Sequence, residues 1–197
     1  MSEDISQIIE LPSENEERAK FCATVFGRFY ENVILAWLKE KYGEDNVWGK
    51  DIRRGTYDGK RIAIDYIIKK ENNGKYEGIL AEAKCWPAYN NGSLKILEND
   101  DKKLKRIKNG SLHKFLSEDF LKKYEIDDEK FGKLKFTKRM IIWWDYKKND
   151  KETIKHKLNI DYLVSIKKDI LQNKSEKIKI VVEKYKKWSE DLFRSLL

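Results

Sequence analysis

Residues 61–86 constrain the fold of this chain more than any other stretch, because they have the pattern of two β-strands joined by a polar turn. Alternation predicts a first strand over residues 61–70. One face of that strand carries Ile62, Ile64, Tyr66 and Ile68, and the other carries Ala63 and Asp65. Residues 71–75 supply the turn, since Asn and Gly tolerate positive φ, and residues 78–86 form the return strand.

The predicted hairpin brings three ionisable side chains together, namely Asp65, Glu82 and Lys84. Side chains two apart leave one face of a strand, and cross-strand neighbours lie roughly 5 Å apart. Two carboxylates that close repel each other unless a cation lies between them, and hard oxygen ligands suit Mg²⁺ or Mn²⁺. The alternative is a surface strand whose Glu82 and Lys84 face water. Small and apolar neighbours favour instead a central strand buried on both faces: Ala81, Ala83, Cys85 and Trp86.

Asp65 followed by Glu82-Ala83-Lys84 resembles the active-site pattern of the PD-(D/E)xK nuclease superfamily, which has the restriction-endonuclease-like fold. The chain departs from that pattern at Ile64, where the family motif has Pro. Asp58 is therefore a second candidate for the first acidic residue, although Tyr57-Asp58-Gly59 favours a turn. The resemblance implies that Asp65, Glu82 and the backbone carbonyl of Ala83 hold Mg²⁺, with Mn²⁺ as a possible substitute. It also implies that Lys84 orients or deprotonates the attacking water.

An N-terminal helix is predicted from Glu14 to Tyr42, since Ser13-Glu14-Asn15-Glu16 forms a capping box and Gly43 follows as a stop. Glu31 falls on an apolar side of this helix, where a carboxylate needs a partner. One interpretation is a salt bridge with Arg28. The other is a further ligand for metal or water, facing Asp65 and Glu82, and the resemblance favours it because the family often has a Glu on its first helix.

The remaining pattern predicts an α/β fold in a single nuclease domain of residues 1–197. Its elements are a short strand near Val47 with a basic loop at Arg53 and Arg54, helices at 93–110 and 111–124, a strand at 140–144, a helical link at 151–158, a strand at 160–166 and a helix at 175–197. The order resembles the αβββαβ core of the suspected family, a mixed central sheet flanked by helices with a helical insertion at 93–124. The apolar stripe of the last helix either closes the core or forms a dimer contact.

Composition favours an anionic partner, because 42 Lys and Arg against 34 Asp and Glu give a net charge of +8. Nucleic acid is the first candidate and a membrane surface the second, while a lysine-rich composition without function is the alternative. Cys22 and Cys85 form no metal or disulfide motif, the N-terminus is acidic, and no apolar run reaches the roughly 20 residues of a membrane span. We expect a cytoplasmic protein without membrane association.

The resemblance implies a Mg²⁺-dependent endonuclease that hydrolyses phosphodiester bonds of double-stranded DNA and leaves a 5′-phosphate and a 3′-hydroxyl. A type II restriction endonuclease working as a homodimer is the first expectation, with Asp65, Glu82, Lys84 and Glu31 as the catalytic residues. Two alternatives stay open: a Holliday-junction or repair nuclease of the same fold, and a non-catalytic nucleic-acid-binding module.

Overall fold

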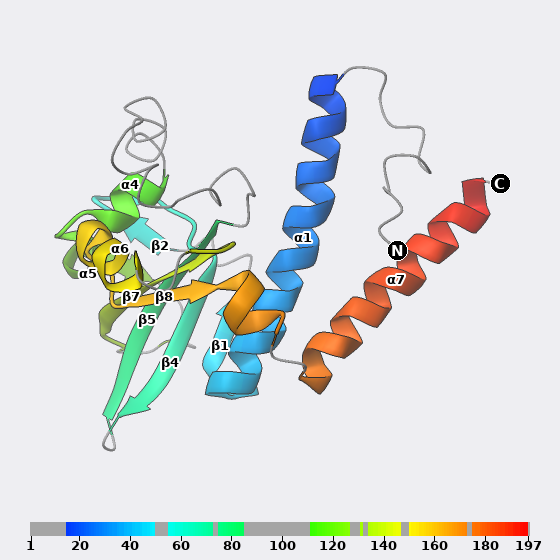
Figure 1. The fold of residues 1–197 in the computed structure, drawn as a ribbon. Coiled ribbons are helices and arrows are strands. Elements are labelled where there is room, and N and C mark those ends of the chain that lie inside the picture. The colour runs from blue at the N-terminus through cyan, green and yellow to red at the C-terminus, as the bar shows by residue number, and fades with distance from the viewer. Residues whose placement is uncertain are drawn as a thin grey trace.

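The computed structural model describes residues 15–49, 55–72, 75–84, 111–126, 131, 134–146, 150–172 and 175–196. The helix predicted at 93–110 and the loop with Arg53 and Arg54 lie outside the described residues. The described part is α/β, with a mixed five-stranded sheet between two groups of helices (Figure 1).

The main sheet has the strand order β1-β4-β5-β7-β8. Its strands are β1 (Val47–Gly49), β4 (Tyr66–Asn72), β5 (Lys75–Lys84), β7 (Phe136–Trp143) and β8 (Tyr162–Ser165). The first three pair antiparallel, and β5, β7 and β8 pair parallel. This mixture follows from the connections, because a tight turn can only join antiparallel strands whereas a parallel pair needs a long crossover.

Strand β5 is the centre of the sheet and is buried on both faces, as predicted. Ile79, Leu80 and Ala81 are fully buried, and Glu82 keeps only 2% of its surface exposed. The interpretation of a surface strand whose Glu82 faces water is therefore wrong. A central strand with a carboxylate near its end places an ionisable group in a low-dielectric position.

The single strand predicted at 61–70 is wrong, because the chain changes sheets there. A small second sheet of order β3-β2-β6 consists of β2 (Gly55–Tyr57), β3 (Lys60–Arg61) and β6 (Tyr124–Ile126). Residues 62–65 cross from β3 to β4, and the Ile62 N–H donates to the Gly55 carbonyl at 2.9 Å. Ile62 and Ile64 consequently pack in a different core cluster from Tyr66 and Ile68.

Asp58 lies in the turn that joins β2 and β3, with a φ of 49°. Its carboxylate pairs with Lys123 Nζ at 3.2 Å on the surface. The interpretation of Asp58 as a turn residue is confirmed.

Each face of the main sheet has its own core. On one face lie α1 (Asn15–Tyr42), the π-helical turn η5 (Ile166–Ile170) and α7 (Glu176–Leu196). On the other face lie α4 (Ser111–Leu116), α5 (Phe120–Lys123) and α6 (Lys151–Leu158). A short 3₁₀ helix, η2 (Glu44–Asn46), follows the end of α1. Leu80 packs on the α4 and α5 side, and Ala81 packs on the α1 side, as expected of alternating side chains.

The helix boundaries follow the sequence signals in most places. α1 ends at Tyr42 before Gly43, whose φ is 96°, and α6 spans the predicted 151–158. The predicted helix at 111–124 is instead two short helices. Arg139 Nη1 donates to the carbonyls of Phe115 and Ser117 at 3.1 and 2.8 Å, and these contacts hold the break between them.

The C-terminal helix α7 packs its first half on α1. Asn32 Nδ2 donates to the Tyr185 hydroxyl at 2.6 Å, and the Tyr185 ring meets Phe29 edge-on at 5.0 Å. Ile178 is buried in the same core, whereas Trp188 is 49% exposed. The helix therefore closes the core over its first turns, and its role in a dimer stays a prediction. Among the described residues, no helix has the length and apolar character needed to cross a membrane.

Gly78 is expected to be required for the packing of β5 on β7. A Cβ at this position would lie 2.6 Å from Phe136 Cδ1 and 3.1 Å from Leu134 Cγ, next to a shift in strand register. We predict that Gly78→Ala lowers the free energy of unfolding by about 1–3 kcal/mol, since overpacking strains a filled core. Gly27→Ala in α1 is the matched control: nothing lies within 4 Å of its Cβ position, so Ala raises stability by up to about 1 kcal/mol. Urea unfolding of both variants checks this, and equal effects would contradict it.

Candidate functional site

Asp65 lies opposite Glu82 at the point where β4 and β5 separate. The last pair of the β4–β5 ladder is Tyr66 with Ala81. Asp65 and Glu82 are the next residues beyond this pair, one on each side. Because the strand ladder stops here, the Ala83 N–H donates to Asp65 Oδ2 at 2.8 Å. A charge-assisted bond of this kind fixes the orientation of the carboxylate. The two acidic residues predicted on adjacent strands are thus neighbours.

Glu82 points into the core on the α4 and α5 side, since it shares a face of β5 with Leu80. Its charge reaches the nearby phenol of Tyr124: burial first, and then the negative charge of Glu82, raise the pKa of that phenol. A buried carboxylate is stable only with polar or ionic partners. Glu82 keeps only 2% of its surface exposed, so water contributes little to its solvation.

Two further predicted groups lie at the same end of β5. In an antiparallel pair, the N–H and C=O of one residue point to the same neighbouring strand, so the Ala83 carbonyl faces the Asp65 side together with its N–H. Lys84 is the last residue of β5. The side chain of Lys84 lies outside the described part of the chain.

Glu31 does not lie together with Asp65 and Glu82. It lies on α1, which covers the face of the sheet opposite to that of Glu82, and its backbone carbonyl accepts from the Tyr66 hydroxyl at 2.9 Å. Within the described residues, no group of three or more His, Cys, Asp or Glu side chains is arranged to hold a metal ion. The role predicted for Glu31 stays a prediction. Asp65, Glu82 and the Ala83 carbonyl still offer hard oxygen donors, which are the ligands that Mg²⁺ prefers.

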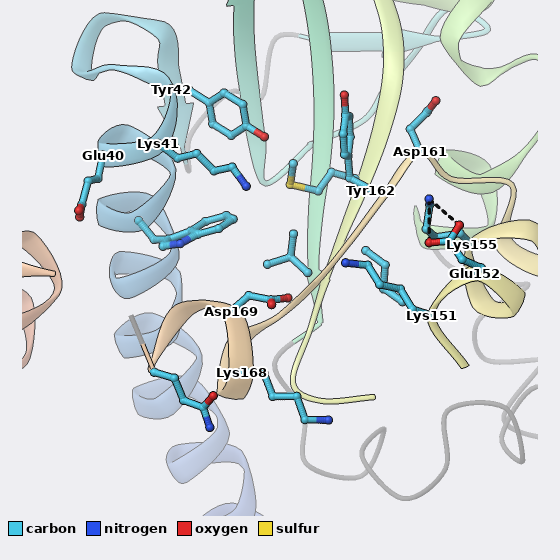
Figure 2. A pocket seen from close by; sticks show the side chains of 15 residues that line it. Glu40, Lys41, Tyr42, Lys151, Glu152, Lys155, Asp161, Tyr162, Lys168 and Asp169 are labelled. Carbon is cyan, nitrogen blue, oxygen red and sulfur yellow. Dashed lines mark hydrogen bonds and ion pairs between the residues drawn. The ribbon is translucent and has the colours of Figure 1, made fainter. Parts of the chain in front are cut away.

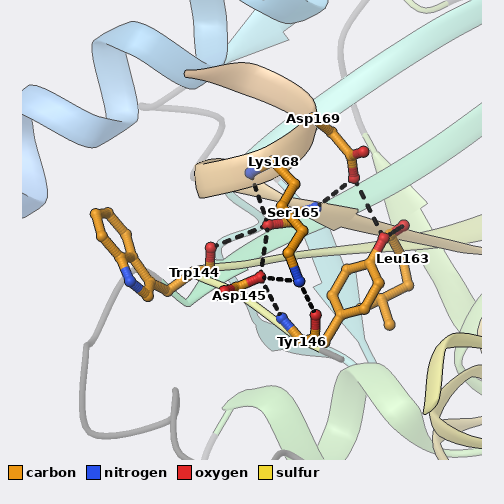
Figure 3. Close-up of polar contacts among 7 residues, drawn as sticks. All are labelled: Trp144, Asp145, Tyr146, Leu163, Ser165, Lys168 and Asp169. Carbon is orange, nitrogen blue, oxygen red and sulfur yellow. Dashed lines mark hydrogen bonds and ion pairs between the residues drawn. The ribbon is translucent and has the colours of Figure 1, made fainter. Parts of the chain in front are cut away.

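The carboxyl ends of β5, β7 and β8 meet at one edge of the sheet, where ligands of α/β proteins commonly bind. Asp145, just after β7, organises polar contacts at this edge (Figure 3). Its Oδ1 lies 2.9 Å from Lys168 Nζ, accepts from Tyr146 N at 2.8 Å and is 3.3 Å from Ser165 Oγ. These bonds tie the end of β7 to η5, so we assign Asp145 a structural role.

The outer side of β8 is closed by the same group of residues. Ser165 N donates to Asp169 Oδ2 at 2.7 Å, and the Tyr146 hydroxyl lies 3.2 Å from that oxygen and 3.3 Å from the Leu163 carbonyl. Tyr146 is 6% exposed and packs in the core, whereas Trp144 is partly buried at the edge of both core clusters. The Ser165 N–H and the Leu163 carbonyl of this edge strand are thus hydrogen-bonded within the chain, which disfavours pairing of these groups with another chain.

A hollow of about 920 Å³ runs along β8 between α1 and α6 (Figure 2). Sequence reasoning missed it, and neither Asp65 nor Glu82 lines it. Burial lowers the pKa of Lys41 and raises the pKa of Tyr42 to about 12 in this hollow. Four basic and four acidic residues line it in equal number: Lys41, Lys151, Lys155 and Lys168 against Glu40, Glu152, Asp161 and Asp169. This balance gives it no preference for a polyanion.

Sequence reasoning also missed Tyr124 as a neighbour of Glu82, because it assigned Tyr124 to the end of a helix. The structure gives Tyr124 to β6, within the core that contains Leu80. No periodic signal marks a three-residue strand, so the sequence pattern could not have revealed this contact.

No family model matches the chain, and no curated protein or solved structure matches it either. The function of the chain is therefore inferred from its own residues and their geometry.

The Asp145 contacts predict a specific dependence of stability on pH. Burial alone would raise the pKa of Asp145, but hydrogen bonds from Lys168 and Tyr146 N outweigh it and hold that pKa below its ordinary value. A depressed folded-state pKa stabilises the protein above the unfolded value of about 3.9, and this contribution disappears as the pH falls through the folded value. We expect Asp145→Asn to lower the free energy of unfolding by about 1–2 kcal/mol at pH 7 and by less below about pH 4.

Urea unfolding of the wild type and of Asp145→Asn from pH 3 to pH 7 measures this difference in the free energy of unfolding. The control is Glu152→Gln, whose carboxylate is 78% exposed beside Lys155 and should change stability by less than about 0.5 kcal/mol. A difference between the wild type and Asp145→Asn that stays constant over this pH range contradicts the assignment.

Proposed function

We propose that this chain is a Mg²⁺-dependent endonuclease of the PD-(D/E)xK type that hydrolyses phosphodiester bonds of double-stranded DNA. The observation that carries the proposal is the end of the β4–β5 pair. There the Asp65 carboxylate accepts the N–H of Ala83 at 2.8 Å, and the residue before Ala83 is the buried Glu82. Two carboxylates just beyond the last β4–β5 pair are suited to a hard divalent cation.

The order of the elements supports the same class. Helix α1 precedes three antiparallel strands, β1, β4 and β5, and the chain then crosses over to β7, parallel to β5 (Figure 1). This agrees with the helix, three strands, helices and strand of the restriction-endonuclease-like core. Asp65 directly precedes β4, the second of these strands, and Glu82 lies near the end of β5, the third.

In this proposal, Asp65, Glu82 and the carbonyl of Ala83 hold the cation. When bound, a divalent cation supplies Lewis-acid stabilisation of the phosphate oxygens and lowers the pKa of a bound water. Lys84 orients or deprotonates the attacking water, which requires that partial burial lower its pKa. Glu31 lies on α1, over the other face of the sheet, and is given no contact to the cation in this proposal. The Asp65–Ala83 bond keeps one carboxylate fixed before any ligand arrives.

The substrate class follows from charge and from the reaction. A net charge of +8 favours binding to a phosphate backbone, whose neutralisation supplies much of the affinity for nucleic acid. Two active sites would cut both strands of a duplex in one binding event, so we propose a homodimer of restriction type. A junction or repair nuclease of the same fold is the second candidate, because the same two carboxylates serve it equally well.

Cleavage of supercoiled plasmid DNA with Mg²⁺ tests the proposal. Asp65→Asn keeps an acceptor for the Ala83 N–H while removing the charge, and Lys84→Ala removes the ammonium. Each variant should reduce the cleavage rate by at least about 100-fold, the lower range for loss of an acid–base group. Glu152→Gln, a surface change away from the pair, should cleave like wild type.

Cleavage of the plasmid into discrete fragments would indicate a restriction endonuclease. A preference for branched DNA would indicate the junction or repair nuclease. DNA binding without cleavage by the wild-type protein would contradict the enzyme and favour a non-catalytic module.

Binding of the cation should also stabilise the folded chain. A ligand present at 100 times its Kd adds about 2.7 kcal/mol to the free energy of unfolding, which corresponds to a rise in Tm of roughly 5–10 °C for a domain of this size. We expect this rise with Mg²⁺ for the wild type and its loss in Asp65→Asn and Glu82→Gln. Thermal unfolding with and without Mg²⁺ measures it. An equal rise in all three proteins would place the cation elsewhere.

A further inference from the structure

The ring of Tyr124 is packed so well that its hydroxyl group is not needed to hold it. Tyr124 is 4% exposed, stacks on Phe120 at 5.3 Å and meets Phe136 edge-on at 5.4 Å. A phenylalanine would make the same ring contacts. The hydroxyl therefore adds something other than packing.

That hydroxyl is buried and has no hydrogen-bond partner among the described residues. Nearly all buried polar groups of folded proteins are hydrogen-bonded, and an exception calls for a reason. Tyr124 also borders a hollow beside β6, but its hydroxyl oxygen is fully covered, so solvent there does not satisfy it. Gly55 leaves the room that the hydroxyl occupies, since a Cβ at that position would overlap it.

Tyr57 offers a direct comparison, because it pairs with Tyr124 across β2 and β6. Its ring also stacks on Phe120, with the ring centroids 5.1 Å apart. Its hydroxyl, however, donates to Asp119 Oδ1 at 2.9 Å and lies 3.3 Å from Ser117 Oγ. Two tyrosines of one cluster thus differ in whether the hydroxyl is hydrogen-bonded, and Tyr57 is also less buried than Tyr124.

The place of the Tyr124 hydroxyl connects it with the two acidic residues. It lies against Gly55, whose carbonyl accepts from Ile62 N at the start of the crossing that ends at Asp65. Glu82 points into the same core on the α4 and α5 side. Burial first, and then the negative charge of Glu82, raise the pKa of the Tyr124 phenol.

We infer that Tyr124 is a positioning residue of the proposed nuclease, whose hydroxyl donates to the Glu82 carboxylate when Glu82 and Asp65 hold the cation. The inference rests on the proposed function. Carboxylates that bind metals are usually hydrogen-bonded by a second residue, and loss of such a partner typically weakens metal binding by 10–100-fold. A carboxylate has about four acceptor positions, so Glu82 can bind a cation and accept this bond together.

The test compares Tyr124→Phe with Tyr57→Phe, using the full chain. Mn²⁺ binding is measured by calorimetry and the Tm of the metal-free protein by thermal unfolding. We expect Tyr124→Phe to weaken Mn²⁺ binding by at least about 10-fold while the metal-free Tm stays equal or rises. Tyr57→Phe should do the reverse, with a lower Tm and unchanged Mn²⁺ affinity. Cleavage by Tyr124→Phe should recover at high metal concentration, since only metal binding is impaired.

Unchanged Mn²⁺ affinity in Tyr124→Phe, while Asp65→Asn loses binding, would overturn the role of Tyr124 and leave the proposed function standing. A metal-free Tm of Tyr124→Phe that falls as far as that of Tyr57→Phe would likewise show that the hydroxyl is structural. If the wild type binds Mn²⁺ no better than Asp65→Asn does, the proposed function fails as well.

Discussion

The point at which β4 and β5 part is the constraint on which the rest of the structure depends. Strand β3 pairs with β2 in the small sheet, and β4 begins only at Tyr66. Residues 62–65 connect the two sheets and therefore do not extend the β4–β5 ladder. The Ala83 N–H is left without a backbone acceptor on β4, and the Asp65 carboxylate takes that place at 2.8 Å. The small sheet, which adds only short strands, thereby sets the position of the first acidic residue.

Burial then gives the pair its chemical character. Glu82 lies on the central strand at 2% exposure, between β4 and β7, where water solvates it poorly. A carboxylate in such a place gains more from a cation than one on the surface, because both desolvation and charge attraction are stronger there. The stacked rings of Tyr57, Phe120 and Tyr124 pack in the core on the Glu82 side of the sheet. The ion pair of Asp145 and Lys168 connects the neighbouring strand ends and is separate from Asp65 and Glu82.

The sequence predicted the parts that rest on long periodic signals and strong stops. Helix α1 with Gly43, helix α6 and the burial of β5 follow from capping, periodicity and small apolar residues. The break at 62–65 was not predictable, since Ile62 and Ile64 alternate like strand residues. No local pattern encodes contacts between distant segments. The sequence therefore could not predict the interaction of Tyr124 with Glu82, nor the hollow that Lys41 and Lys168 both line.

The central claim is that Asp65 and Glu82 converge to hold one divalent cation, and anomalous X-ray diffraction from crystals soaked in Mn²⁺ tests it most directly. The account predicts a single strong peak within coordination distance of both carboxylates and of the Ala83 carbonyl, absent from Asp65→Asn crystals. No peak there, or a peak only in the charged hollow along β8, would contradict it.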